Sequence, residues 1–243
     1  MFSHLVDISK RDKIAKLSIN EQTYFCEKND MRIVILATED QKIEIINGKN
    51  KASATNIIFI KSISEIESYK DFDALLLLTD PLPDFEPEVI AQKPVIINSV
   101  INTLESQKLP SNFSRINGWP GFLGRPVCEV AANDHYSAES VFKALEWDVS
   151  FVKDTPGLVT ARVLSMIINE AYFALGENVS TKNEIDLAMK LGTNYPMGPF
   201  EWLDKIGIDN IYHLLKKLFE TNKRYLIAPL LETAFQESAL IRL

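Results

Sequence analysis

Short, uninterrupted runs of apolar residues constrain this chain more than any other feature. Four such runs lie in the first hundred residues: Met31–Thr38, Ile57–Ile60, Asp73–Thr79 and Pro94–Asn98. A strand that is apolar on both faces needs cover on both faces, which is typical of a parallel sheet packed between helices. Short helices are expected between and after the strands, over Ser62–Tyr69, Glu86–Gln92 and Ile101–Gln107. The alternation predicts an α/β fold with a parallel sheet.

A break at Asp154-Thr155-Pro156-Gly157 separates this pattern from a helical one. Before the break we expect three more strands and one helix, over Phe113–Asn117, Val127–Ala131, Trp147–Val152 and Ser137–Glu146. We therefore expect an α/β domain over residues 1–153, with residues 1–30 as a leading extension, and an all-α domain over residues 154–243.

The first helix after the break is expected from about Pro156 to Leu175, capped by Asp154 or Thr155. It is apolar on nearly every face, which indicates burial in a bundle or at a subunit interface and favours a homodimer formed through the C-terminal helices. Thr181 and Glu184 form a T-x-x-E capping box that predicts the start of the next helix.

The turn after the first strand lacks the glycines that a dinucleotide-binding Rossmann domain needs. Such a turn carries G-x-G-x-x-G because backbone N–H groups must approach a pyrophosphate closely. Here the turn is Ala37-Thr38-Glu39-Asp40, with two carboxylates, and Lys42–Ile46 after it looks like a strand. The first 117 residues contain a single glycine, Gly48. These residues predict a reduced Rossmann-like domain that does not bind NAD in the ordinary way.

Composition excludes several classes of function. The net charge of −7 argues against nucleic acid as a partner, since phosphate binding needs a basic face. No apolar run approaches the roughly 20 residues of a membrane span, and the N-terminus has no signal-peptide core, so a cytoplasmic protein is expected. Two cysteines, Cys26 and Cys128, and three scattered histidines have no metal-ligand spacing, so no metal site is expected.

Two stretches resemble the 3-hydroxyacyl-CoA dehydrogenases. They are KDTPGLVTARVLSMIINEAYFAL, residues Lys153–Leu175, and EIDLAMKLGTNYPMGPFEWLDKIGID, residues Glu184–Asp209. The resemblance implies an N-terminal NAD-binding Rossmann domain and a C-terminal helical domain that commonly dimerises. It also implies oxidation of a 3-hydroxyacyl-CoA with NAD, a step of fatty-acid β-oxidation, in which a histidine acts as base and a glutamate orients it.

The resemblance assigns site residues one position at a time. Glu129, in Val127-Cys128-Glu129-Val130, matches the glutamate, and counting back twelve positions from it reaches Asn117 in place of the histidine. An amide cannot accept a proton at neutral pH, so the general base is absent. The substrate-binding positions include the retained residues Asn98 and Arg162, and Ser99 matches the family serine only with a shift. The asparagine of the family pattern falls on Ala161.

Two classes of function follow. The first is an NAD-dependent 3-hydroxyacyl-CoA dehydrogenase with displaced catalytic groups. The second is a non-catalytic relative that binds an acyl-CoA-like ligand or a protein, and the missing base and glycine loop favour it. Each residue also has a purely structural interpretation: Glu129 as a surface carboxylate, Asn117 as a turn former, and Arg162 with Asn169 and Glu170 as a polar cluster between the domains.

Overall fold

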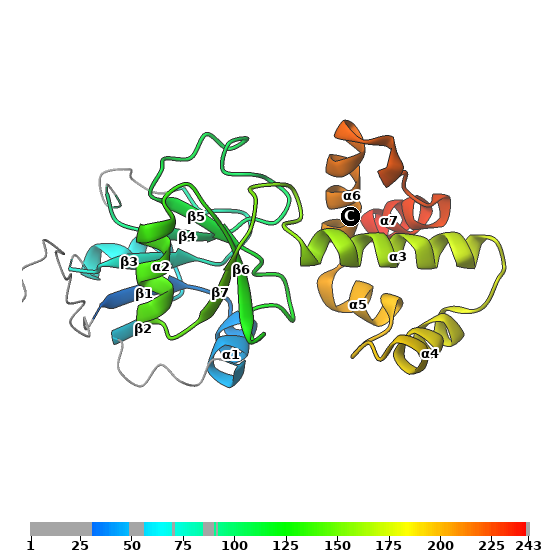
Figure 1. Cartoon of the computed structure of the whole chain (residues 1–243), viewed down its shortest axis with the longest axis horizontal. Coiled ribbons are helices and arrows are strands. Elements are labelled where there is room, and N and C mark those ends of the chain that lie inside the picture. Colours follow the sequence, from blue (N-terminus) through cyan, green and yellow to red (C-terminus); the bar gives the residue numbers. More distant parts are fainter. Residues whose placement is uncertain (1–30, 49–55, 70, 85–89, 91, 242–243) are drawn as a thin grey trace, which may run out of the picture.

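The computed structural model describes residues 31–48, 56–69, 71–84, 90 and 92–241. An α/β unit comes first and a helical unit follows it, as Figure 1 shows. The strands are β1 (Arg32–Leu36), β2 (Asn56–Ile60), β3 (Ala74–Leu77), β4 (Val95–Asn98), β5 (Phe113–Ile116), β6 (Val127–Ala132) and β7 (Asp148–Phe151). The predicted class, a Rossmann-like α/β fold with a helical C-terminal region, is confirmed. The expected extension over residues 1–30 lies outside the described residues, and so does most of Glu86–Gln92.

The described strands form one sheet in the order β2-β1-β3-β4-β5-β6-β7. All neighbours are parallel except β5 and β6, which are antiparallel. Successive side chains of a strand point to opposite faces, so an apolar run supplies two cores. Ile33 and Ile35 pack with the core beneath helices α1 (Glu39–Gly48) and α2 (His135–Ala144). Val34 and Leu36 pack on the opposite face, beneath the 3-10 helix η1 (Ile63–Tyr69).

Strand β1 lies at a topological switch point, because the chain leaves it toward β2 on one side and returns to β3 on the other. In open α/β sheets, ligands bind in the crevice beyond the carboxyl ends of the two strands at such a point. Here the crevice lies beyond Leu36 of β1 and Leu77 of β3, beside the N-terminus of α1.

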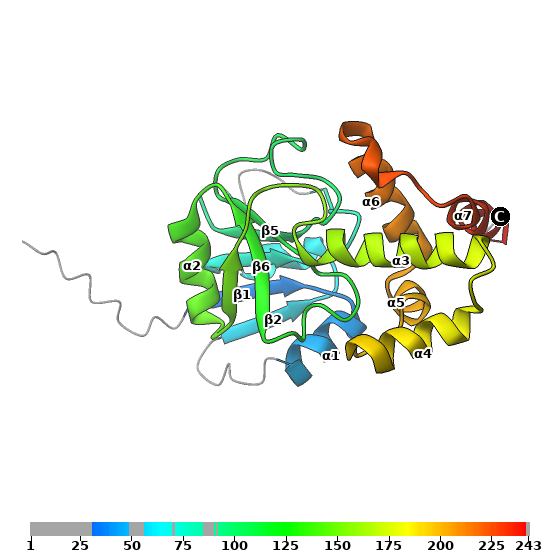
Figure 2. The ribbon, with the colours of Figure 1, turned by 45° about the vertical axis from the view of Figure 1, so that its right-hand side comes forward.

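The helical unit is arranged around α3 (Thr160–Gly176). The remaining helices are α4 (Lys182–Thr193), α5 (Pro199–Ile206), α6 (Ile208–Thr221), the 3-10 turn η3 (Lys223–Tyr225) and α7 (Pro229–Ile241). In Figures 1 and 2, α3 extends away from the sheet, with α4 and α5 on one side and α6 on the other. None of the described helices has both the length and the apolar character needed to cross a membrane.

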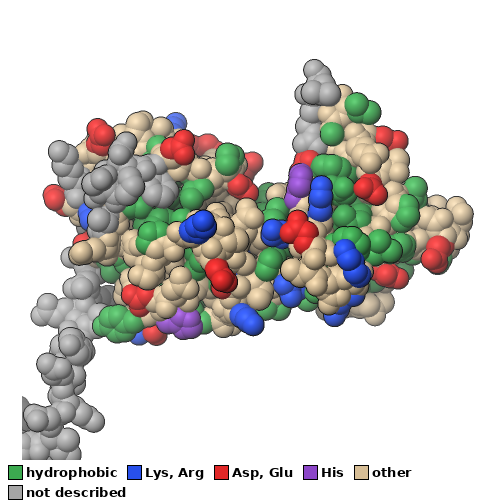
Figure 3. Space-filling view, turned by 90° about the horizontal axis from the view of Figure 1, so that it is seen from above, with side chains coloured by type: hydrophobic (Ala, Val, Ile, Leu, Met, Phe, Trp, Pro, Cys, Tyr) green, Lys and Arg blue, Asp and Glu red, His purple; other side chains and the backbone are tan. Residues whose placement is uncertain are grey.

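The two units share a hydrophobic core. Trp119 and Phe122 belong to the loop between β5 and β6, yet they pack among the buried side chains of the helical unit, with Phe122 tilted against Trp202 of α5 at 5.7 Å between ring centroids. Figure 3 shows the two units as adjoining lobes, with basic and acidic side chains interspersed over the face in view. The loop from 117 to 126 is therefore the structural link that positions a site between the units.

Three local predictions were wrong. The segment from Lys42 to Ile46 is helical, because Thr38 and Gln41 form a capping box that starts α1 two residues after β1. The segment Ile101–Gln107 forms turns, without a helix.

The third error concerns the start of α3, which begins at Thr160 rather than near Pro156. Gly157 and Leu158 have positive φ angles of 82° and 49°, which interrupt a right-handed helix. Asp154 does not cap α3. Its carboxylate accepts hydrogen bonds from the backbone N–H groups of Leu104 and Glu105.

Candidate functional site

The side chain of Gln41 lies beside the carboxyl ends of the strands at the switch point. Its Nε2 donates to the carbonyl oxygen of Leu78, just beyond β3, at 2.7 Å, and to that of Gly118, beyond β5, at 3.3 Å. Its Oε1 accepts from the backbone N–H of Thr38, and the Thr38 hydroxyl accepts from the N–H of Gln41. One side chain thus caps α1 and ties it to the segments that follow β3 and β5.

Asn98 completes this network from the end of β4. Its Nδ2 donates to the Leu78 carbonyl at 3.1 Å, and its Oδ1 accepts from the Gly118 N–H at 2.9 Å. A Cβ at position 118 would lie 2.8 Å from Cγ of Asn98, so only glycine permits this approach. The buried Asn98 amide therefore has both ends satisfied by backbone, and Ser99 beside it bonds to Asn102 and Gln107.

The residues around this crevice do not fit a dinucleotide pyrophosphate. The first turn of α1 carries Glu39 and Asp40, whose charges stabilise the helix N-terminus but repel phosphate. A phosphate at a helix N-terminus binds to the backbone N–H groups of the first turn. In α1 the N–H of Gln41 already donates to the Thr38 hydroxyl. The middle of α1 is anchored as well, since the Glu44 carboxylate accepts from the Gly121 N–H at 2.5 Å.

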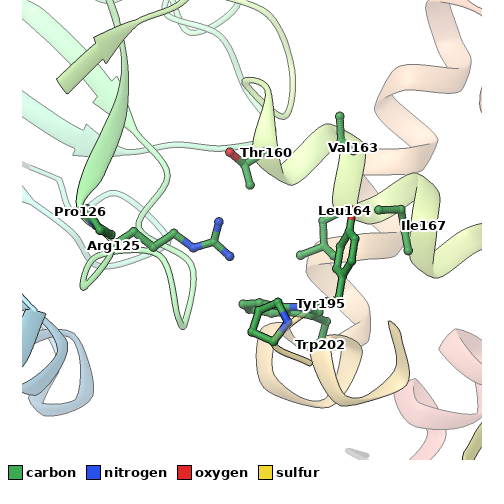
Figure 4. Close-up of a pocket in the computed structure, with 9 residues that line it drawn as sticks. Arg125, Pro126, Thr160, Val163, Leu164, Ile167, Tyr195 and Trp202 are labelled. Atoms are coloured by element: carbon green, nitrogen blue, oxygen red, sulfur yellow. The ribbon is translucent and has the colours of Figure 1, made fainter. Parts of the chain in front are cut away.

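Two adjacent cavities lie between the α/β unit and the helical unit. The larger has a volume of about 490 Å³ and is mostly apolar, and Figure 4 shows its lining residues: Arg125, Pro126, Thr160, Val163, Leu164, Ile167, Tyr195, Pro196 and Trp202. The smaller has a volume of about 280 Å³ and is lined in part by Asn117, Glu129, Ser150 and Thr160. Arg125 lines both, so its side chain lies where the two cavities meet.

The structure brings Asn117 and Glu129 to the same cavity, although twelve positions separate them in the chain. Asn117 follows β5 and is 5 % exposed. Its Oδ1 accepts from the backbone N–H of Trp119 at 3.1 Å, as in an Asx turn. Within the described part of the chain, its Nδ2 has no acceptor. A buried donor without a partner is costly and needs an explanation, which a ligand in the cavity would supply.

Glu129 hydrogen-bonds to the start of the helical unit. Its carboxylate accepts from the backbone N–H of Val159 at 3.1 Å and from that of Thr160 at 3.0 Å, and it also bonds the Thr160 hydroxyl. These groups form the N-terminus of α3, whose own N-cap residue, Val159, supplies no side-chain acceptor. Glu129 therefore caps α3 from β6, where its charge also meets the positive end of the helix dipole.

The other substrate-binding candidates lie outside the two cavities. Arg162 donates from Nε to the Pro156 carbonyl at 3.1 Å, and its guanidinium lies 5.9 Å from the Tyr225 ring centroid. Asn98 and Ser99 bond within the strand-end network. Asn169 is 2 % exposed and holds the loop before α7 through the Leu226 carbonyl and the Ala228 N–H. No group of three or more potential metal ligands occurs among the residues that the structure describes.

Sequence reasoning missed Arg115 and Arg125. Arg115 on β5 is fully buried, and its guanidinium donates to the Asp154 carboxylate at 2.5 Å and to the carbonyls of Ser99 and Thr155 at 2.8 and 2.7 Å. Arg115 thus ties the segment that connects the two units, at Asp154 and Thr155, to Ser99 at the end of β4. No sequence pattern singles out Arg115 within its strand. Arg125 lies between Asn117 and Glu129, four residues before Glu129.

Comparison with known proteins agrees with this architecture. The family model described as 3-hydroxyacyl-CoA dehydrogenase, C-terminal domain, matches residues 157–242. The helical unit is thus similar to the C-terminal domain of this family. Similar curated proteins include the 3-hydroxyadipyl-CoA dehydrogenase of Escherichia coli, 45 % identical over 67 residues, which are 28 % of this chain and 14 % of that protein.

Two further relatives have longer alignments. The 3-hydroxybutyryl-CoA dehydrogenase of Bradyrhizobium diazoefficiens is 40 % identical over 111 residues, 45 % of this chain and 38 % of that protein. The enzyme of the same name from Clostridioides difficile is 39 % identical over 93 residues, 37 % of this chain and 33 % of that protein. The matched region thus spans well under half of each relative.

Solved structures extend the similarity of fold to both units. The (S)-3-hydroxybutyryl-CoA dehydrogenase of Ralstonia eutropha aligns with a TM-score of 0.66 at 19 % identity, covering 86 % of this chain and 94 % of that one. The 3-hydroxybutyryl-CoA dehydrogenase of Escherichia coli aligns with a TM-score of 0.64 at 14 % identity, covering 86 % and 57 %. At these identities the likeness concerns the fold.

Proposed function

We propose that this chain is a 3-hydroxyacyl-CoA dehydrogenase-like protein of fatty-acid metabolism that binds an acyl-CoA-like ligand between its two units and has lost NAD-dependent oxidoreductase activity. The observation that carries the proposal is the Gln41 network across the switch-point crevice. It supports a ligand-binding role without NAD because Gln41 is bonded to the segments beyond β3 and β5, beside the switch point, while cavities remain between the two units.

Electrostatics at the crevice supports the loss of NAD binding. Glu39 and Asp40 stand in the first turn of α1, where a pyrophosphate would lie. Each like-charge contact at a few ångströms costs on the order of a few kcal/mol at intermediate dielectric. Binding would also break the bonds from Gln41 to Leu78 and Gly118, and no glycine in the turn offers a replacement donor at close range.

The chemistry at Asn117 supports the loss of turnover. By the resemblance it stands in the position of the family histidine, and it lines the cavity with Glu129, but its amide cannot accept a proton as a base at neutral pH. A general base contributes about a hundredfold to ten-thousandfold. Glu129, the matched glutamate, is bonded to the N-terminus of α3. Asn117 instead offers a hydrogen-bond donor to a bound ligand.

The alternative, an active dehydrogenase, draws on the resemblance to NAD-dependent enzymes. The two are separated by mixing the full chain with NADH and acetoacetyl-CoA and following NADH absorbance, with parallel calorimetric titrations of NADH and hexanoyl-CoA. We expect no turnover, no NADH binding at millimolar concentration, and binding of hexanoyl-CoA. Turnover of the wild-type chain would refute the proposal.

The variant Asn117→His separates a missing base from a missing cofactor site. If the crevice excludes NADH, the restored imidazole produces no turnover. Turnover in this variant alone would mean that the cofactor still binds and that our interpretation of the Gln41 network is wrong. Gln41→Ala is the matched variant for the crevice, and we expect it to leave NADH unbound because Glu39 and Asp40 remain.

We further propose a homodimer formed through the helical unit. Apolar side chains at Val179, Leu187 and Leu191, on α4 and the turn before it, are 68 %, 53 % and 79 % exposed. Burial of such a face against a second copy would remove this apolar area from water. Sedimentation equilibrium should give a dimer mass, and Leu187→Glu with Leu191→Glu should give the monomer. A wild-type monomer at micromolar concentration would contradict the proposal.

A further inference from the structure

Arg125 extends from the β5–β6 loop across the gap between the two units, as Figure 4 shows. Its guanidinium carbon lies 4.4 Å from the Phe122 ring centroid and 5.4 Å from that of Trp202. Its Nε donates to the Gly121 carbonyl at 3.4 Å. These two cation–π contacts restrain the guanidinium beside the rings, in the lining that both cavities share.

This cation has no ion-pair partner among the described residues. Burial lowers the pKa of Arg125, and the charge of Glu129 opposes this without forming an ion pair. The Glu129 carboxylate is directed to Val159 and Thr160. A partly desolvated charge without a partner is unfavourable, and an anion bound beside it would relieve the cost.

The lining of the larger cavity defines what kind of anion fits. Apart from Arg125, the lining is mainly apolar. It includes Val163, Leu164 and Ile167 of α3 and Trp202 of α5. One guanidinium pairs well with one carboxylate, through two parallel hydrogen bonds. A phosphate-bearing group would call for several cations or a cluster of backbone donors, whereas an apolar cavity of about 490 Å³ suits a hydrocarbon chain.

Asn117 supplies an independent second observation. Its buried amide lines the smaller cavity together with Arg125, and Nδ2 is a donor that no described residue satisfies. A ligand that carries an acceptor near Asn117 and a carboxylate near Arg125 would use both groups.

We propose that the interdomain site selects an acyl thioester whose acyl chain ends in a carboxylate, with Arg125 as the residue that determines this specificity. The inference rests on the proposed function, since it names the ligand class for the same site. The methylene groups lie against the apolar wall and the terminal carboxylate pairs with the Arg125 guanidinium. No covalent step is involved.

The test compares two thioesters of equal carbon number, adipyl-CoA and hexanoyl-CoA, by isothermal titration calorimetry of the full chain. Because both carry the same CoA, contacts to its phosphates cancel. A charge-assisted pair contributes enough for about a tenfold to hundredfold preference for adipyl-CoA. Arg125→Met, which keeps an apolar side chain beside the rings, should abolish this preference by weakening adipyl-CoA while leaving hexanoyl-CoA within about threefold.

Lys205→Met is the matched control, because the Lys205 ammonium also lies near Trp202, at 6.0 Å from its ring centroid, but does not line either cavity. We expect this variant to retain the full preference. Circular dichroism of both variants verifies that they are folded.

Each other outcome has a distinct meaning. Equal affinity of the wild-type chain for the two thioesters overturns the carboxylate inference and leaves the proposed function intact. Equal weakening of both by Arg125→Met places the guanidinium on the CoA moiety and also overturns it. Failure of both thioesters to bind the wild-type chain refutes the proposed function together with the inference.

Discussion

Replacing Glu129 by alanine should destabilise the fold, because it removes the cap of α3. The carboxylate accepts from the backbone N–H groups of Val159 and Thr160, and the N-cap residue itself contributes no side-chain bond. Loss of a cap costs about 0.5–2 kcal/mol, and loss of a negative charge at a helix N-terminus adds about 0.3–1 kcal/mol. The expected decrease in the free energy of unfolding is therefore about 1–3 kcal/mol.

Urea unfolding followed by far-ultraviolet circular dichroism measures this decrease. Glu129→Gln keeps an acceptor oxygen and loses only the charge, so it should cost about 0.3–1 kcal/mol. Glu170→Ala, at an exposed glutamate on the same helix, should stay within about 0.5 kcal/mol of the wild type. If Glu129→Ala were no more destabilising than Glu170→Ala, the assignment of Glu129 as the cap of α3 would be refuted.

Three further predictions concern contacts between separate segments of the chain. Asp154→Asn weakens the pair with the fully buried Arg115 while preserving an acceptor, and should cost about 1–3 kcal/mol in the same urea assay; an unchanged midpoint would contradict the pairing. Gly198→Ala would place a Cβ 2.3 Å from the carboxylate of Asp186, which caps α5. We expect the free energy of unfolding to fall by about 1–3 kcal/mol, and an unchanged value would argue against this packing. Hydrogen bonds from Lys190 and the Gly198 N–H lower the pKa of Glu201. Its contribution to stability is therefore present above the ordinary glutamate pKa and is lost as pH falls through the lowered pKa. The urea midpoints of the wild type and Glu201→Gln should converge below about pH 4, and a difference that stays constant with pH would refute this.

Strong local patterns made much of the fold predictable. Buried strands such as β1 and β3 were found because both of their faces are apolar, and the capping box of Thr181 and Glu184 forms as expected. Asn117 and Glu129 could be singled out together because the resemblance places two site residues twelve positions apart, and the antiparallel β5–β6 pair brings both to one cavity.

Other features depended on contacts that no local pattern reports. Arg115 sits in a buried strand, where a charged residue has meaning only with its partner Asp154, 39 positions away. The strand-like composition after β1 concealed α1, although Thr38 and Gln41 carry a T-x-x-Q signature that would have revealed it. The orientation of Arg125 depends on Trp202, which belongs to the other unit.

Trp119 and Phe122 lie in the α/β part of the sequence but complete the hydrophobic core of the helical part. A chimera that exchanged the chain at the Asp154 junction would therefore separate the helices from two of their own core side chains. A successful graft of the helical unit onto another Rossmann-like domain must include the loop from 117 to 126. In engineering terms, the unit that would be transferred consists of the helices together with the loop between β5 and β6, although that loop lies before the Asp154 junction in the chain.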